Sequence, residues 1–185
     1  LDGLLFNTGI FTNLSQDHLD YHKNTKNYLK AKLYLFEKLI KKRGNIITDE
    51  QIPEFKKIKD IASNKNLNLF SLLDKKNNFQ FLSHQYEGEY QLLEIKYKNS
   101  IHKIKLNLIG KVQFKNVLMA AIAAIKSSVN IEDILNTIPK IKSVEGRFEK
   151  VGRIKNNSKV ILDYAHTPDA LKTCLTNIKE QFPGK

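Results

Sequence analysis

Segments with the periodicity of strands and segments with the periodicity of helices alternate along this 185-residue chain. Such alternation favours an α/β fold over a helical bundle. The pattern predicts strands over 6–12, 45–48, 67–73, 79–86, 90–98, 101–108, 147–154 and 160–163, the last of them buried. The strand over 6–12 is likewise expected to be buried. The pattern predicts helices over 25–42, 53–64, 112–127, 131–140 and 167–181, and a polar loop over 13–24.

Three consecutive strand-like runs stand apart from the rest. Glu87-Gly88-Glu89 and Asn99-Ser100 separate them, and both are turn signals. They predict a small antiparallel meander. We place a domain boundary after the last helix of the first part, so that residues 1–146 form one domain. Residues 147–185 then begin a second α/β domain.

The charge of the chain is strongly positive. Its formal net charge is +12, but only Arg43, Arg147 and Arg153 are arginines among 31 basic residues. Base reading and bidentate phosphate contacts favour arginine. The scattered lysines, accompanied by many Asn and Ile residues, therefore favour a solvated surface over a nucleic-acid footprint, while anionic substrates such as nucleotides remain compatible.

Two further features bear on the environment of the protein. The longest apolar run, 117–125, is too short to span a membrane. The single cysteine, Cys174, excludes an internal disulfide framework and fits a reducing compartment such as the cytoplasm. We expect no membrane partner.

Lys32 lies in the middle of the apolar stripe of the predicted helix 25–42. On a helical wheel, Tyr28, Leu35, Phe36 and Leu39 fall within about 60° of it. An unpaired ammonium there is costly. Either the side chain snorkels to water, or Lys32 has a task, which could be a covalent modification or an anionic partner.

The segment 17–22, Asp-His-Leu-Asp-Tyr-His, offers two carboxylates and two imidazoles within six residues. These groups can hold a divalent metal or orient phosphate, although Asp17 or Asp20 can equally cap a turn.

A second polar segment follows the strand predicted over 160–163. Asp163 ends that strand, and a loop with His166 leads to the next helix. This is where α/β folds place ligand contacts, although Thr167 or Asp169 can simply cap the helix. Arg147, alone among lysines before a strand, suggests planar or bidentate recognition, or a surface ion pair.

Five stretches resemble the Mur ligases, most closely those of the MurE type. They keep the family's order and spacing across essentially the whole chain, and the last is the most specific. The stretches are residues 11–22, 28–36, 110–116, 144–149 and 163–171. The resemblance implies a Mur ligase central domain, with a mainly parallel sheet flanked by helices, and the beginning of a Rossmann-like C-terminal domain.

The resemblance also implies roles for individual residues. The lysine matching Lys32 is carbamylated in the family and becomes an oxygen ligand for Mg²⁺, and His18 matches a histidine that contacts magnesium. Asn116 and Arg147 match residues at the adenine and ribose of ATP. Asp163 matches the ribose-binding acid, and His166 lies where the C-terminal domain closes on the phosphates. Gln113 and Glu145 depart from the family pattern, which has Asn and Pro there.

The implied activity is ATP-dependent addition of an amino acid, expected to be meso-diaminopimelate, to UDP-N-acetylmuramoyl-L-alanyl-D-glutamate through an acyl phosphate. Alternatives are a lysine-adding or folylpolyglutamate-type ligase, a lysine-rich nucleic-acid-binding module, and a degenerate non-catalytic protein. No G-x-x-x-x-G-K-[ST] phosphate loop occurs in the chain. We therefore expect a monomeric part of a ligase that cannot turn over ATP alone.

Overall fold

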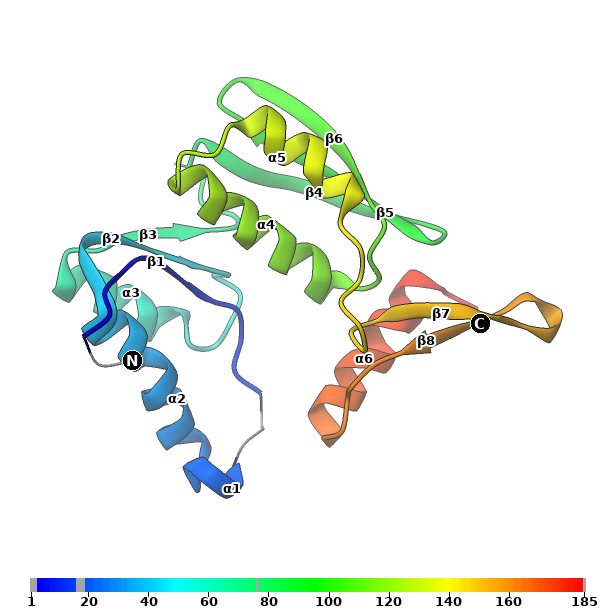
Figure 1. The fold of residues 1–185 in the computed structure, drawn as a ribbon, viewed down its shortest axis with the longest axis horizontal. Coiled ribbons are helices and arrows are strands. Elements are labelled where there is room, and N and C mark those ends of the chain that lie inside the picture. The colour runs from blue at the N-terminus through cyan, green and yellow to red at the C-terminus, as the bar shows by residue number, and fades with distance from the viewer. Residues whose placement is uncertain (1–2, 16–18, 76, 185) are drawn as a thin grey trace. The chain divides into compact units, whose positions relative to one another are not determined.

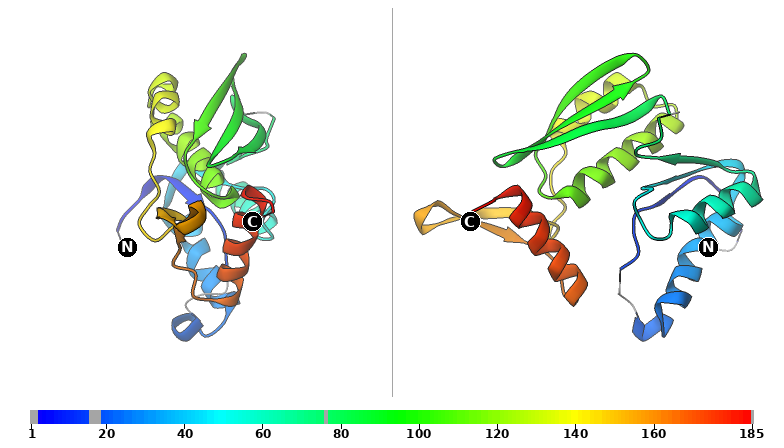
Figure 2. Two further views of the ribbon diagram at one scale, coloured as in Figure 1. Left: turned by 90° about the vertical axis from the view of Figure 1, so that its right-hand side faces the viewer. Right: turned by 180° about the vertical axis from the view of Figure 1, so that it is seen from behind.

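A computed structural model describes residues 3–15, 19–75 and 77–184 of the chain, which divides into two compact units (Figures 1 and 2). The first unit contains residues 1–80 and 118–130, and the second contains 81–117 and 131–185. The helix α4 (Lys111–Lys126) begins in the second unit and ends in the first. The predicted α/β class is confirmed, whereas the predicted domain boundary at residues 146 and 147 stays a prediction.

The first unit is built on a parallel sheet of three strands in the order β1-β2-β3. Its elements are β1 (Phe6–Phe11), α1 (Leu19–His22), α2 (Thr25–Tyr34), the π-helix η1 (Leu35–Leu39), β2 (Ile40–Thr48), α3 (Phe55–Lys65) and β3 (Asn68–Ser71). The neighbouring β2 residues Ile46 and Ile47 point to opposite faces, and both are completely buried. The sheet is therefore covered on both faces at this part of its central strand, as parallel sheets generally are. The strand β1 was predicted to be buried, but Asn7 and Ile10 are exposed, and only Gly9 and Phe11 are buried.

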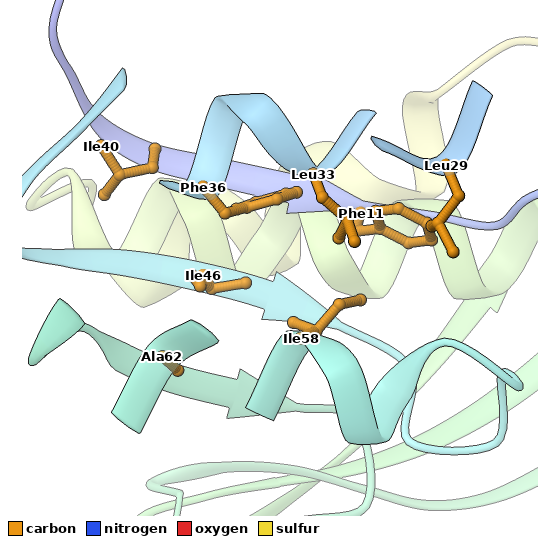
Figure 3. Close-up of a cluster of buried hydrophobic side chains, with 8 residues drawn as sticks. All are labelled: Phe11, Leu29, Leu33, Phe36, Ile40, Ile46, Ile58 and Ala62. Carbon is orange, nitrogen blue, oxygen red and sulfur yellow. The ribbon is translucent and has the colours of Figure 1, made fainter. Parts of the chain in front are cut away.

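One apolar cluster holds α2, η1 and α3 against the sheet (Figure 3). It joins Phe11, Leu29, Leu33, Phe36, Ile40, Ile46, Ile58 and Ala62. The spacing of Leu29, Leu33 and Phe36 follows the helical repeat. Of the residues predicted to share an apolar stripe with Lys32, Phe36 belongs to this cluster and Leu35 packs against it. The side chain of Asn24 begins α2 by accepting a hydrogen bond from the Asn27 amide at 2.8 Å.

The predicted helix 25–42 is shorter in the structure, because its last turn widens into η1 and the chain enters β2 at Ile40. Pairing is irregular at first, since Phe6 faces Ile40 while Thr8 already faces Asn45. The extra residues form a bulge at which a Cβ on Gly44 would lie 2.8 Å from the Lys41 carbonyl oxygen. Regular pairing from Asn45 matches the strand predicted from there.

The loop predicted over 13–24 contains the short helix α1. Four residues are one turn, too short to carry a helical repeat, so the sequence pattern gave no signal for it. The ring of His22, at the end of α1, stacks on Tyr28 of α2 with centroids 4.8 Å apart.

The second unit contains the predicted meander, in the order β4-β5-β6, and a separate two-stranded sheet. Its elements are β4 (Phe79–Glu87), β5 (Tyr90–Tyr97), β6 (Ser100–Leu106), α5 (Ile131–Thr137), the 3-10 helix η2 (Ile138–Lys140), β7 (Glu149–Ile154), the 3-10 turn η3 (Lys155–Asn157), β8 (Ser158–Leu162) and α6 (Pro168–Gln181). The strand β5 pairs antiparallel with β6, and β7 pairs antiparallel with β8.

The helix α6 lies alongside β7 and β8 (Figures 1 and 2). The strand β8 was predicted to be buried, and this prediction is wrong. Its residues alternate, so that Ile161 packs toward Cys174 of α6, whereas Val160 and Leu162 are exposed. Because α6 covers only one face of this two-stranded sheet, a continuous apolar run does not indicate burial on both faces here.

Candidate functional site

The side chain of Lys32 extends from α2 toward the segment that follows β1. Its Nζ donates a hydrogen bond to the carbonyl oxygen of Asn13 at 3.0 Å. It also lies 4.9 Å from the ring centroid of Tyr28 and 5.8 Å from that of Phe11. The half-buried ammonium is therefore satisfied by a carbonyl dipole and two aromatic faces rather than by water alone.

This arrangement suits a cation better than a metal-binding carbamate. A carbonyl oxygen and the faces of two aromatic rings all carry partial negative charge. They attract the positive ammonium group and would repel a negatively charged carbamate. Among residues 3–15, 19–75 and 77–184, no group of three or more His, Cys, Asp or Glu side chains could hold a metal ion. His18 lies outside the described residues, so nothing follows for it. The surroundings of Lys32 as described are thus those of its unmodified ammonium group.

The loop around Arg147 is folded by its own backbone. Gly146 and Phe148 both adopt left-handed backbone conformations, with φ of 66° and 48°. The Gly146 amide donates to the Glu149 carboxylate at 2.9 Å, and the Arg147 amide donates to the Val144 carbonyl at 2.9 Å. This tight loop leaves the Arg147 side chain exposed, with its guanidinium 5.4 Å from the ring centroid of Tyr164.

Asp163 joins that loop to the segment after β8. Its Oδ2 accepts from the Phe148 amide and its Oδ1 from the Ala165 amide, both at 3.0 Å. The Tyr164 amide donates in turn to the carbonyl of Gly146 at 2.8 Å. The Asp163 bond supports Phe148 in a conformation that non-glycine residues rarely adopt. Each carboxylate oxygen still has a second lone pair, so this half-buried aspartate can also accept from a sugar hydroxyl.

His166 lies on the exposed side of the same loop pair. Its Nδ1 is 2.9 Å from the carbonyl oxygen of Tyr164, and the two rings meet edge to face at 4.9 Å. Because a carbonyl only accepts, Nδ1 carries the proton in this contact, and Nε2 is the acceptor nitrogen of the neutral ring. Thr167, one of the two capping residues that the sequence left open, caps α6 by accepting from the Ala170 amide.

The start of α4 reaches the Arg147 loop through Gln113. The Gln113 Nε2 donates to the carbonyl oxygen of Arg147 at 3.3 Å. Asn116 follows one helical turn later on the same side of α4 and is half-buried. The second unit thus brings Asn116, Arg147, Asp163 and His166 toward one region, while Lys32 belongs to the first unit.

Sequence reasoning missed two residues of this region. Tyr164 contacts both Arg147 and His166, and Gln113, which departs from the family pattern, makes the bond that joins α4 to the Arg147 loop. The position of Tyr164 in the sequence, between the candidate residues Asp163 and His166, could have pointed to it. An amide, an acid, a cation and aromatic rings are groups that contact a base, a ribose and phosphates, so the described residues fit a nucleotide.

Comparison with known proteins decides the family. The Mur ligase middle domain matches residues 1–124, and the glutamate ligase domain of Mur ligases matches residues 146–185. The chain belongs to the Mur ligase family. In this Mur ligase chain, no helix of the described residues is long and apolar enough to cross a membrane.

Three similar proteins span nearly the whole Mur ligase chain. It is 38% identical over 169 residues to the UDP-N-acetylmuramoyl-L-alanyl-D-glutamate--2,6-diaminopimelate ligase of Fusobacterium nucleatum, covering 90% of this chain and 33% of that protein. It is 34% identical over 179 residues to the ligase of the same name from Rickettsia bellii, covering 97% of this chain and 37% of that protein.

The third is a solved structure, the MurF ligase of Thermotoga maritima in complex with ADP. It matches with a TM-score of 0.77 at 17% identity, covering 98% of this chain and 40% of that one. This likeness shows the shared fold. The Mur ligase chain spans about a third of the length of the curated relatives that it matches.

Proposed function

We propose that this chain supplies the adenine-nucleotide contacts of a MurE-type, ATP-dependent amide ligase. The observation that carries the proposal is the single region formed by Gln113, Arg147, Asp163 and His166, joined by hydrogen bonds from α4, the Arg147 loop and the segment after β8. The names of the curated relatives support diaminopimelate as the amino acid and UDP-N-acetylmuramoyl-L-alanyl-D-glutamate as its acceptor.

Each residue has a distinct role in this proposal. The amide of Asn116 contacts adenine, and the exposed guanidinium of Arg147 contacts the base and ribose. The remaining lone pairs of Asp163 accept from the ribose hydroxyls. His166, at the exposed end of the loop, approaches the phosphates.

The reaction divides into two group transfers. The γ-phosphoryl group passes to a carboxylate oxygen of the D-glutamate, and ADP leaves. The amine of the amino acid then attacks the acyl carbon, loses a proton and expels inorganic phosphate. The side chains of this chain hold the nucleotide in line for the first transfer, because phosphoryl transfer depends mainly on positioning and on stabilising charge.

The proposal retains Mg²⁺, with Lys32 as a carbamate and His18 as its ligands, on the strength of the family resemblance alone. For Lys32 this requires the side chain to leave the Asn13 carbonyl. Supplying ¹³C-bicarbonate should give a carbamate carbon signal that is lost in Lys32→Ala and retained in Lys30→Ala, the exposed lysine two residues earlier. A signal unchanged in Lys32→Ala would remove the carbamate from the proposal.

We further propose that the chain works as a monomer in the cytoplasm, where ATP is available, and binds neither nucleic acid nor membrane. Its mobility in gel filtration should be that of a 21.4 kDa monomer. A random-sequence oligonucleotide should bind weakly and be released at physiological salt, because scattered lysines make few phosphate contacts. Tight binding at that salt would favour the nucleic-acid alternative.

Calorimetry with ADP and UDP tests the nucleotide proposal. The purified chain should bind ADP more tightly than UDP, and Arg147→Met should weaken ADP binding by about tenfold, the loss of a charge-assisted contact. The matched control is Arg153→Met, which removes the other exposed arginine of the second unit, one that pairs with Glu89. Equal affinities for ADP and UDP, or equal losses in the two variants, would contradict the proposal.

A further inference from the structure

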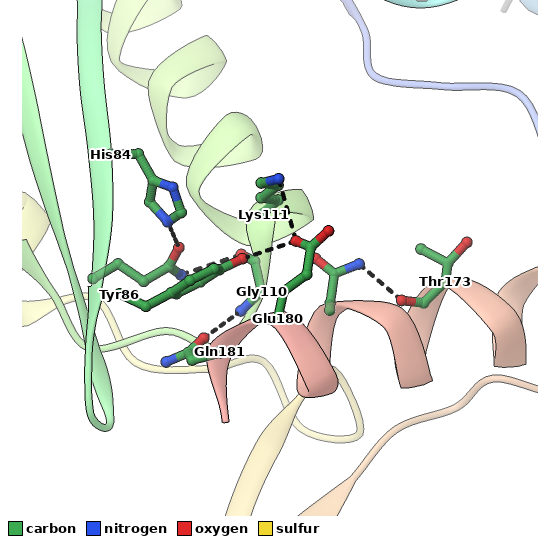
Figure 4. Close-up of polar contacts among 9 residues, drawn as sticks. His84, Tyr86, Gly110, Lys111, Thr173, Glu180 and Gln181 are labelled. Carbon is green, nitrogen blue, oxygen red and sulfur yellow. Dashed lines mark hydrogen bonds and ion pairs between the residues drawn. The ribbon is translucent and has the colours of Figure 1, made fainter. Parts of the chain in front are cut away.

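Gly110, the residue before α4, is held from two sides by buried glutamines (Figure 4). Its amide donates to Oε1 of Gln181 at 2.9 Å, and its carbonyl accepts from Nε2 of Gln91 at 3.2 Å. Gln91 is completely buried and Gln181 is 3% exposed. We call Gln91, Gly110 and Gln181 the glutamine relay.

The direction of every bond in the relay is fixed. Gln91 Nε2 donates to the carbonyls of Leu108 and Gly110, so its Oε1 is the acceptor. That oxygen lies 2.8 Å from Nε2 of His84, which must therefore carry the proton. The chain of donors runs from His84 on β4 through Gln91 and Gly110 to Gln181 in the last turn of α6.

Only glycine fits at the centre of the relay. Gly110 has a φ of 86°, and a Cβ there would lie 2.9 Å from Oδ1 of Asn177. Asn177 is held in place by its own bond, from Nδ2 to the carbonyl of Thr173 at 2.8 Å. The helix α6 is thus in direct contact with the backbone at the start of α4.

A polar rim surrounds the relay. Lys111 Nζ pairs with Glu180 at 3.2 Å, and the Tyr86 hydroxyl donates to the same carboxylate at 3.3 Å. Exposed pairs of this kind contribute little stability, so the buried bonds define the geometry. Two buried atoms, Asn177 Oδ1 and Gln181 Nε2, have no hydrogen-bond partner among the described atoms. Burying such atoms between α6 and the start of α4 costs free energy. Loss of one further bond of the relay should therefore move Gly110 measurably.

Gly110 sets the position of the α4 residues proposed to contact the nucleotide. Its carbonyl accepts from the Gln113 amide at 3.2 Å, which begins the first turn of the helix. Gln113 then bonds the Arg147 carbonyl, and Asn116 lies one turn further along. A movement of Gly110 would therefore move both of these contacts.

We propose that Gln91 and Gln181 are positioning residues for adenine-nucleotide binding, and that they act on the nucleotide through Gly110 and α4. Neither glutamine touches the nucleotide. The inference rests on the proposed function, since it needs Asn116 to contact adenine. It adds that residues 71 positions apart in sequence, Gly110 and Gln181, are coupled to nucleotide affinity.

A double-mutant cycle with ADP tests the inference. Gln181→Met keeps the length of the side chain but removes the acceptor, and should weaken ADP binding by about three- to tenfold, the effect of one hydrogen bond. In the Asn116→Ala background the same change should have a smaller effect, because one of the two contacts that Gly110 positions is gone. Gln91→Met should behave in the same way, and Thr176→Met, at an exposed position of α6, should change nothing.

Equal weakening by Gln181→Met in both backgrounds would show a merely structural role and overturn the inference. Hydrogen exchange of the Gly110 amide gives a second readout that needs no nucleotide. The amide should be protected in the wild type and exchange faster in Gln181→Met. An unprotected Gly110 amide in a chain that binds ADP would overturn the inference alone, whereas failure of the wild type to bind ADP would overturn the proposed function and the inference together.

Discussion

Different kinds of contact stand out inside each of the two units of this chain. In the first, eight apolar side chains from β1, α2, η1, β2 and α3 form one cluster. The second unit also buries apolar side chains, among them Leu93, Ile95 and Leu106. In addition, its buried glutamines bond the backbone of Gly110, and Asp163 bonds the backbone of two loops. Apolar contacts are non-directional and tolerate adjustment, whereas hydrogen bonds fix distances and angles.

The difference matches what each unit is proposed to do. Nucleotide contacts require donors and acceptors at defined positions, which a network of directional bonds can supply. The first unit provides the parallel sheet and the half-buried Lys32. If this comparison is right, substitutions in the apolar cluster should cost the most stability, and substitutions in the polar networks should cost less while changing the nucleotide contacts.

The largest effect is expected from Phe36→Ala in the apolar cluster. Phe36 is 2% exposed, and removing its ring should lower the free energy of unfolding by about 3–5 kcal/mol. Urea unfolding followed by circular dichroism measures the change, with the exposed Lys38→Ala as control. A smaller loss of unfolding free energy in Phe36→Ala than in Gly110→Ala or Asp163→Asn would contradict the comparison.

Gly110→Ala should have the next largest effect. The left-handed backbone and the overlap with Asn177 together should cost about 2–4 kcal/mol. The control is Gly152→Ala on β7, where the added methyl meets no atom within 4 Å, and alanine should be neutral or slightly stabilising. Equal unfolding midpoints for the two variants would show that Gly110 is not constrained as described.

Asp163→Asn should sharpen the comparison by separating stability from binding. The Phe148 and Ala165 amides bond different carboxylate oxygens, and in asparagine one of these positions becomes an NH2 donor that faces an amide donor. The free energy of unfolding should therefore fall by about 1–3 kcal/mol. ADP binding should weaken as well. Unchanged ADP affinity in a folded variant would remove Asp163 from the nucleotide site.

The smallest expected effect is a pH dependence from His84. Burial, with a further contribution from Lys111, lowers the pKa of His84 below its ordinary value of 6.5. His84 therefore takes up a proton at a higher pH in the unfolded chain than in the folded chain. The free energy of unfolding should fall as the pH drops below 6.5. In His84→Gln this slope should be shallower in urea titrations between pH 7 and roughly pH 5. An identical slope would mean that His84 titrates alike in both states.

Much of the first unit could be predicted from the sequence because its contacts are periodic. The stripe predicted around Lys32 included Phe36, which lies in the apolar cluster, and Leu35, which packs against it. The bulge before Asn45 could not be predicted, because it depends on how closely Gly44 approaches the backbone of another strand. The partner of Lys32, a backbone carbonyl 19 residues earlier, leaves no mark on composition or periodicity.

The second unit shows the limit more clearly. The meander was predicted from turn residues, and the Asp163 segment from its place at a strand end. Gln91 and Gln181 carried no signal, since a glutamine in a strand or a helix is ordinary and its role depends on a glycine far away in sequence. Local patterns predict elements, whereas bonds between distant residues require the fold.

The most direct test of the account is a map of amide chemical shifts in the ¹⁵N-labelled chain as ADP is added. The account predicts shifts that concentrate at Asn116, Arg147, Asp163 and His166 and extend to Gly110. Shifts confined to the lysines of α3, or spread over the exposed lysines without this cluster, would contradict it and indicate non-specific attraction of an anion to a basic surface.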